Sequence, residues 1–186
     1  MTNTLSIEQI LKCKPCCTRE QLEKIAGDKK EWTALEIMGL TLLSPEDQIR
    51  IMCKTKILPD KIVREFACRC VEEALKVMEN PDPRSVAAIA AMRAWLKKEI
   101  SNKELAEARK TADDAFQTAY ACLEDHAAYC FTRAVCFAVD ATTSLAHWAA
   151  CFATYVIRHA VNARAYNMAR PKQVKILKEL INATIE

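Results

Sequence analysis

The chain has 186 residues, a formal net charge of +3 at pH 7, 51% hydrophobic residues and 27% charged residues. This balance is typical of a globular chain and excludes intrinsic disorder, while the small net charge argues against nucleic-acid binding. The chain has only two glycines. Because hairpin turns depend on glycine for positive φ angles, the composition favours helices over strands.

The sequence shows no signal for export or for a membrane. Residues 1–14 become polar within a few positions, unlike the apolar centre of a signal peptide. No apolar run reaches the roughly 18 residues that a membrane-spanning helix needs. Most of the ten cysteines lie in Ala-rich segments, where a reduced thiol packs as a small hydrophobic group. We therefore expect a cytoplasmic protein that has no membrane partner.

Residues 5–43 are predicted to form three short helices. Two Ser/Thr-x-x-Gln steps, at Ser6 and Thr18, fit capping boxes, in which side-chain oxygens bind free N–H groups at the helix start. Gly27 and Gly39 stand where helices end. No alternating pattern in the chain indicates a strand.

Longer helices are predicted after residue 43. Prolines at the first helical position open helices at Pro45, Pro59 and Pro83, and a capping box at Ser101 opens a long helix that runs to about residue 123. The helix after Pro83 is expected to bury a stripe at three- and four-residue spacing. This stripe consists of Val86, Ile89, Ala90, Arg93 and Leu96.

The last third is predicted to form three helices. Asp125 is expected to cap a helix that begins at residue 126, and the polar residues 140–144 are expected to break it. A helix over residues 145–165 follows, and Pro171 is predicted to start the final one.

These elements predict an all-α fold, a single-domain bundle of about eight to ten helices with an Ala-rich core. We expect one domain over residues 1–186, with a lobe of short helices at 1–56 and the Ala-rich core at 57–186. Small residues such as Ala87, Ala88, Ala90, Ala91, Ala127, Ala128, Ala149 and Ala150 would allow close helix approach. The aromatic residues expected to fill the wider gaps are Trp95, Phe131, Phe137, Trp148 and Phe152.

Two groups of thiols could carry chemistry, and each has a simpler interpretation. Cys13, Cys16 and Cys17 form a C-x-x-C-C step whose spacing zinc accepts, but the pair is not repeated as in the usual zinc signature. Cys53 or the pair Cys68/Cys70 could complete a set of four ligands, but Cys68 and Cys70 face different sides of their helix. We predict no metal and no cofactor, with Cys13, Cys16 and Cys17 as the weak candidates. His126 and Cys130 could form a nucleophile pair, but the sequence offers no oxyanion hole, so a packed cysteine beside a histidine is favoured.

The candidate ligand-binding residues lie in the last third of the chain. Polar groups in the apolar stretch 136–161 need partners, and a hydrogen bond between Asp140 and His147 across the predicted turn would supply one. An Arg/Tyr cluster follows, which could hold a nucleotide-sized anion or could simply be a solvated charged face. The full set is Asp140, His147, Tyr155, Arg158, His159, Arg164, Tyr166 and Arg170.

The order of three segments resembles a known family. LPDKIVREFACRCVEEAL, PDPRSVAAIAAMRAWLKKEIS and KELAEARKTADDAFQTAYAC, followed by an Ala/His-rich helix pair, are similar to the putative immunity protein family, all-helical domains found in bacteria and phages. The matching steps are Phe66-Ala67-Cys68, Pro83-Arg84 with Ile89, Arg93, Trp95 and Ser101, and Thr143 with His147. The resemblance covers residues 57–165. Lys98 departs from it, because the family often has Gly there, and the family's Thr-Ala-His step is spread to Thr-Ser-Leu-Ala-His.

The resemblance implies a non-enzymatic binding protein of immunity or anti-defence type, which neutralises a protein toxin or defence effector. It implies no active site, and we predict no catalytic residues. A second hypothesis is a phage-type sponge that sequesters a small anionic nucleotide signal on the Arg/Tyr cluster, shared across a homo-oligomer. A third is a zinc- or thiol-dependent enzyme built on the cysteines.

Overall fold

The computed structural model describes residues 4–121, 125–140, 143–160 and 163–184, except for the side chains at 143–145, 147, 157–160, 163, 164 and 166. The described residues form ten helices and two strands of three residues each. The all-α prediction is therefore confirmed, and the prediction that no strand exists was wrong.

The N-terminal part consists of short elements. They are β1 (Thr4–Ser6), α1 (Ile7–Lys12), α2 (Arg19–Ala26), β2 (Glu31–Thr33) and α3 (Ala34–Gly39). The two strands pair antiparallel, with Leu5 opposite Trp32, and both of these side chains are buried. Three-residue strands are too short to show a two-residue alternation, so the sequence pattern could not reveal them.

The predicted capping boxes at Ser6 and Thr18 are both present, and a third, unpredicted one opens α3 at Thr33. Gly27 ends α2 with a φ of +54°, a conformation that favours glycine. Gly39, in contrast, is still helical, and Leu40 caps α3.

Seven longer helices follow. They are α4 (Pro45–Lys54), α5 (Asp60–Leu75), α6 (Pro83–Leu96), α7 (Asn102–Ala121), α8 (His126–Asp140), α9 (Thr143–Ala160) and α10 (Ala163–Asn182). The Asp125 carboxylate caps α8 by accepting from the Ala128 N–H at 2.9 Å, as predicted. Pro59 is the N-cap of α5 and does not occupy its first helical position.

Pro171 lies inside α10 and does not start a helix, which corrects the predicted boundary. Proline removes one N–H donor, but its fixed φ suits helical backbone. Packing against α9 carries α10 through this position: Ala169 is buried just before the proline, and the Gln173 amide donates to the Ala150 carbonyl at 2.8 Å just after it.

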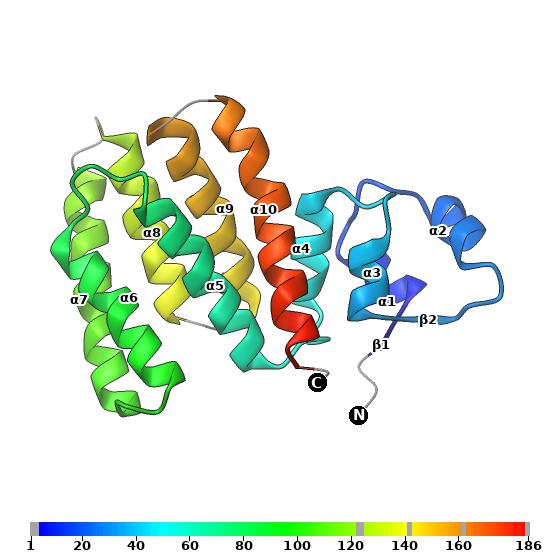
Figure 1. Cartoon of the computed structure of the whole chain (residues 1–186), viewed down its shortest axis with the longest axis horizontal. Helices are drawn as coiled ribbons and strands as arrows, with labels where there is room; N and C mark the ends of the chain where they lie inside the picture. The colour runs from blue at the N-terminus through cyan, green and yellow to red at the C-terminus, as the bar shows by residue number, and fades with distance from the viewer. Residues whose placement is uncertain (1–3, 122–124, 141–142, 161–162, 185–186) are drawn as a thin grey trace.

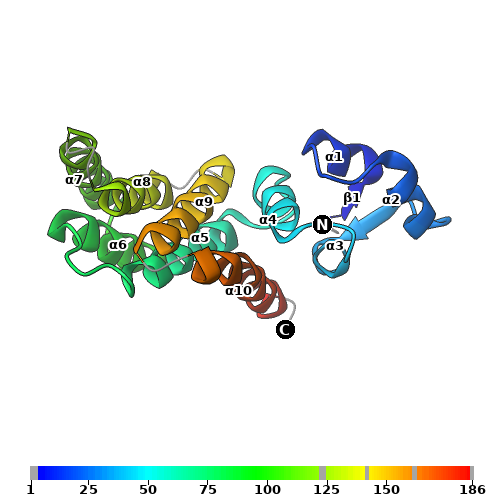
Figure 2. The same ribbon diagram turned by 90° about the horizontal axis from the view of Figure 1, so that it is seen from above.

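The long helices form two layers (Figures 1 and 2). Helices α6, α5 and α10 lie side by side in one layer, and α7, α8 and α9 form the other. Helix α4 stands at the edge, between this array and the short N-terminal elements. One continuous hydrophobic cluster runs from Leu5 in β1 to Ile181 in α10.

Small residues pack inside the helical array. Of the predicted alanines, Ala88, Ala149 and Ala150 are buried, whereas Ala87 and Ala90 are exposed and were wrongly placed at helix contacts. The alanines with no exposed surface are Ala67, Ala74, Ala112, Ala115, Ala134, Ala138, Ala149, Ala150 and Ala153. The predicted stripe of α6 was right at Ile89 and wrong at Val86 and Ala90, which are exposed; the buried residues are Ser85, Ala88, Ile89 and Met92. Apolar residues surround α6 on nearly every side, so spacing alone could not identify the buried face.

Candidate functional site

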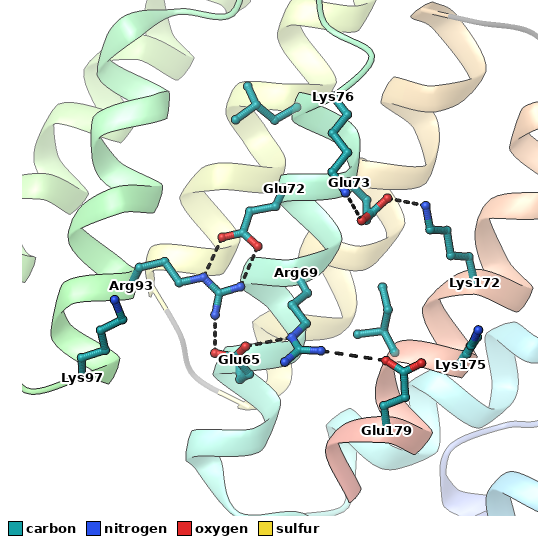
Figure 3. Close-up of a pocket in the computed structure, with 12 residues that line it drawn as sticks. Glu65, Arg69, Glu72, Glu73, Lys76, Arg93, Lys97, Lys172, Lys175 and Glu179 are labelled. Carbon is teal, nitrogen blue, oxygen red and sulfur yellow. Dashed lines mark hydrogen bonds and ion pairs between the residues drawn. The ribbon is translucent and has the colours of Figure 1, made fainter. Parts of the chain in front are cut away.

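Charged residues of α5, α6 and α10 line a groove on one face of the molecule (Figure 3). We call it the charged groove. It has a volume of about 970 Å³. Its charged lining consists of Glu65, Arg69, Glu72, Glu73, Lys76, Arg93, Lys97, Lys172, Lys175 and Glu179.

Arg93 of α6 is the centre of the groove's ion-pair network. Its guanidinium binds both carboxylate oxygens of Glu72 at 2.6 Å and also binds Glu65. Glu65 in turn accepts from Arg69 at 2.9 Å, and Arg69 reaches Glu179 of α10 at 4.0 Å. Figure 3 shows this chain of contacts crossing from α6 over α5 to α10.

The electrostatics fit a self-paired network. Burial raises the pKa of Glu65, but the hydrogen bonds from Arg93 and Arg69 outweigh burial and hold that pKa below its usual range. The bidentate contact with Glu72 raises the pKa of Arg93. Glu73 has a lowered pKa for the same kind of reason, because Lys172 and Lys76 outweigh its burial. The groove therefore ties three helices together through ion pairs formed within the chain.

The family-like residues of α6 serve the same structural purpose. Arg84 binds the Asp82 carboxylate and donates to the Thr118 hydroxyl of α7 at 3.1 Å. The Arg64 guanidinium of α5 lies 4.7 Å from the centre of the Trp95 ring, whose N–H donates to Asn102 at 2.8 Å. Together with Arg93, these side chains fix α6 against both neighbouring helices.

The outer side of α7, α8 and α9 carries a second candidate surface, which we call the aromatic face. It consists of Phe116, Tyr120, Tyr129, Phe137, Trp148, Phe152 and Tyr155, with Arg133 among them. The chain has three Trp, four Tyr and five Phe, so more than half of its aromatic residues gather here. In Figure 2 these three helices form one layer, whose inner side faces α5, α6 and α10 and whose outer side faces away from them.

The rings of the aromatic face contact one another from helix to helix. Tyr129 of α8 lies 5.6 Å from Phe116 of α7 and 6.5 Å from Phe152 of α9, measured between ring centres. Phe152 continues to Phe137 at 5.6 Å and to Tyr155 at 6.3 Å. These separations are those of favourable aromatic pairs. The rings thus form one continuous network of contacts across α7, α8 and α9.

Several of these aromatic side chains are strongly exposed. The exposed fractions are 55% for Tyr120, 46% for Trp148 and 38% for Tyr155. Trp148 was predicted to fill the core, and this was wrong. The helix α9 buries Ala146, Ala149, Ala150 and Ala153, and residue 148 points away from that face.

Of the predicted ligand-binding residues, the structure describes the side chains of Asp140, Tyr155 and Arg170. Asp140 forms a bidentate pair with Arg109 of α7, with both contacts at 2.7 Å. Arg170 turns toward α9 and donates to the Cys151 sulfur and the Gln173 amide oxygen, each at 3.2 Å. Tyr155 belongs to the aromatic face. The side chains of His147, Arg158, His159, Arg164 and Tyr166 lie outside the described residues, so the predicted Asp140–His147 bond stays a prediction.

The cysteine candidates do not come together as ligands. Cys13 and Cys17 are buried and Cys16 is exposed, with its N–H donating to Asp47 at 3.1 Å. Burial raises the pKa of both buried thiols. Burial also raises the pKa of Cys130 to about 11, the wrong direction for a nucleophile. In the described part of the chain, no group of three or more His, Cys, Asp or Glu side chains could hold a metal ion.

Comparison with known proteins identifies the class. A model of the family described as Imm-5 like putative immunity protein matches residues 54–180. This match covers well over half of the chain, and the chain therefore belongs to that family. The matched range contains both the charged groove and the aromatic face, and it leaves out the short N-terminal elements and all of α4 except Lys54.

No curated protein and no solved structure matches the chain. None of the described helices is long and apolar enough to cross a membrane.

Proposed function

We propose that this chain is an immunity protein that neutralises a protein toxin or effector by binding it directly, without catalysis. Membership of the immunity family supports the general role. The proposal that the chain binds its partner directly is supported by the aromatic face.

The observation that carries the proposal is the exposure of Tyr and Trp side chains around an arginine. Tyr, Trp and Arg are the residues that supply most of the binding energy in protein interfaces. A chain that only had to fold would gain by burying such large rings, yet Trp148 and Tyr120 remain about half exposed. Contacts with neighbouring rings hold the exposed side chains of Tyr120 and Tyr155 in place, which lowers the entropy lost when a partner docks.

The two other hypotheses receive less support. The nucleotide sponge needs Arg170 to face a ligand, whereas its guanidinium contacts Cys151 and Gln173. The thiol enzyme needs an acidic cysteine, whereas burial raises the pKa of Cys68, Cys130 and Cys136.

A growth-rescue screen tests the proposal. A panel of bacterial toxin domains is expressed, one at a time, in a sensitive host with or without this chain. We expect growth to be restored for one toxin or a few related ones, with a stable complex in which both proteins keep their unmodified masses. Rescue without a complex, with a cleaved or modified toxin, would contradict neutralisation by binding, and so would the absence of rescue by the folded chain.

A further inference from the structure

Arg133 occupies the middle of the aromatic face. It lies on α8, one helical turn from Tyr129 and one from Phe137, and its guanidinium carbon is 4.6 Å from the centres of both the Phe116 and Phe137 rings. The two rings hold the cation by cation–π attraction and fix its position between α7 and α8.

None of the ion pairs formed among the described residues includes Arg133. This separates it from Arg109 on the same side of the molecule, which is paired with Asp140, and from Arg93 on the opposite side, which binds two glutamates. Ring faces attract the charge of a guanidinium but do not accept its in-plane N–H groups. Those donors need acceptors once water is removed by a partner.

We propose that the aromatic face binds an acidic segment of the partner protein, with a carboxylate pairing with Arg133 and apolar side chains packing on the surrounding rings. This inference rests on the proposed function and adds that the partner's binding segment is acidic. A carboxylate is the acceptor that matches a guanidinium with two parallel hydrogen bonds, and these bonds strengthen in a water-poor interface. A basic or neutral partner would instead leave the Arg133 charge buried and uncompensated.

The surroundings of Arg133 favour the same partner. The chain carries a net charge of +3, which attracts acidic surfaces during encounter. At the C-terminal end of α8, the Asp140 carboxylate is already neutralised by Arg109. The exposed Tyr120 ring lies 6.0 Å from the Phe116 ring on which the Arg133 guanidinium packs, so an exposed ring adjoins the cation on the neighbouring helix α7.

The test uses a displayed library of random dodecapeptides selected on the immobilised full chain. We expect the enriched peptides to combine Asp or Glu with aromatic or aliphatic residues. Their affinity should fall at least about tenfold on Arg133→Glu and stay unchanged on Lys30→Glu, which makes the same charge change at an exposed site in the N-terminal part. Arg133→Gln should fall between the two, and circular dichroism verifies that each variant is folded.

A reciprocal exchange makes the test specific. Replacing the essential acidic residue of a selected peptide by Lys should abolish binding to the natural chain and restore it on Arg133→Glu. The inference is overturned if no peptide is enriched, if the enriched peptides lack acidic residues, or if Arg133→Glu binds them as well as Lys30→Glu does. Growth rescue by the chain in any of those cases would leave the proposed function standing and remove only the acidic-partner assignment.

Discussion

The two layers of this protein present opposite kinds of surface. On the side of α5, α6 and α10, each glutamate of the charged groove has a cation from the chain itself as its partner. On the side of α7, α8 and α9, large rings are exposed, and the Arg133 guanidinium packs on the Phe116 and Phe137 rings and joins none of the ion pairs formed among the described residues. The difference indicates that a dense charge cluster can stabilise the fold, whereas a less charged surface with exposed rings is the better candidate for recognition.

The largest effect expected is on binding, at the aromatic face. Replacing Trp148 by Ala removes an exposed ring, so we expect selected peptides, or the toxin found by rescue, to bind about 2 kcal/mol or more weaker. The free energy of unfolding should change by less than about 1 kcal/mol, because the ring is 46% exposed. Isothermal titration calorimetry and urea unfolding measure the two quantities. Loss of stability without loss of affinity would assign Trp148 to the fold.

The opposite result is expected in the charged groove. Arg93→Met should lower the free energy of unfolding by about 1–3 kcal/mol, because Glu72 and Glu65 lose a charged hydrogen-bond donor while half-buried. Affinity for the partner should not change. Lys76→Met is the matched control, since Lys76 is 66% exposed in its side chain and should change stability by less than about 0.5 kcal/mol. Equal changes in the free energy of unfolding for the two substitutions would disprove the structural role of Arg93.

The sequence was sufficient to predict the helix caps but not the role of Arg93. Caps were predictable because they depend on residues a few positions apart, as at Ser6, Ser101 and Asp125. Arg93 was assigned to an apolar stripe because its spacing fits one, and its true partners lie 21 and 28 residues away in the chain.

The aromatic face was missed for a related reason. The segment 136–161 is apolar on nearly every side, so helical spacing gives no preferred buried face for Trp148. Only the packing of three helices shows that alanines fill the inner side and leave the large rings outside. No sequence pattern singles out Arg133, because its role depends on two rings from different helices.

The charged groove should also respond to acid. The folded pKa values of Glu65 and Glu73 are lowered, so their contribution to stability is present above the unfolded value of about 4.3 and is lost as the pH falls through the folded values. We expect the free energy of unfolding to fall from about pH 5 to about pH 3. In a Glu65→Gln/Glu73→Gln variant this fall in the free energy of unfolding should be smaller. Urea unfolding at a series of pH values measures this dependence. If the free energy of unfolding depends on pH equally in the variant and the natural chain, neither glutamate contributes to the dependence.

The smallest effect concerns Lys98, where the family often has Gly. Its φ of +64° is left-handed, and its N–H and that of Glu99 bond back to Trp95 and Ala94 in the pattern that ends helices at glycine. Lys98→Gly should therefore raise the free energy of unfolding by about 0.5–1 kcal/mol. Lys97→Gly is the control and should not stabilise, because residue 97 is right-handed helical. Thermal unfolding distinguishes the two.

The most direct measurement places a photo-crosslinking amino acid, p-benzoylphenylalanine, at position 148 on the aromatic face or at position 175 on the charged groove. Each variant is irradiated with the toxin that growth rescue identifies. We expect a covalent adduct from position 148 and none from position 175. An adduct from position 175 without one from position 148 would show that the partner docks on the charged groove and would rule out the aromatic face as the binding surface.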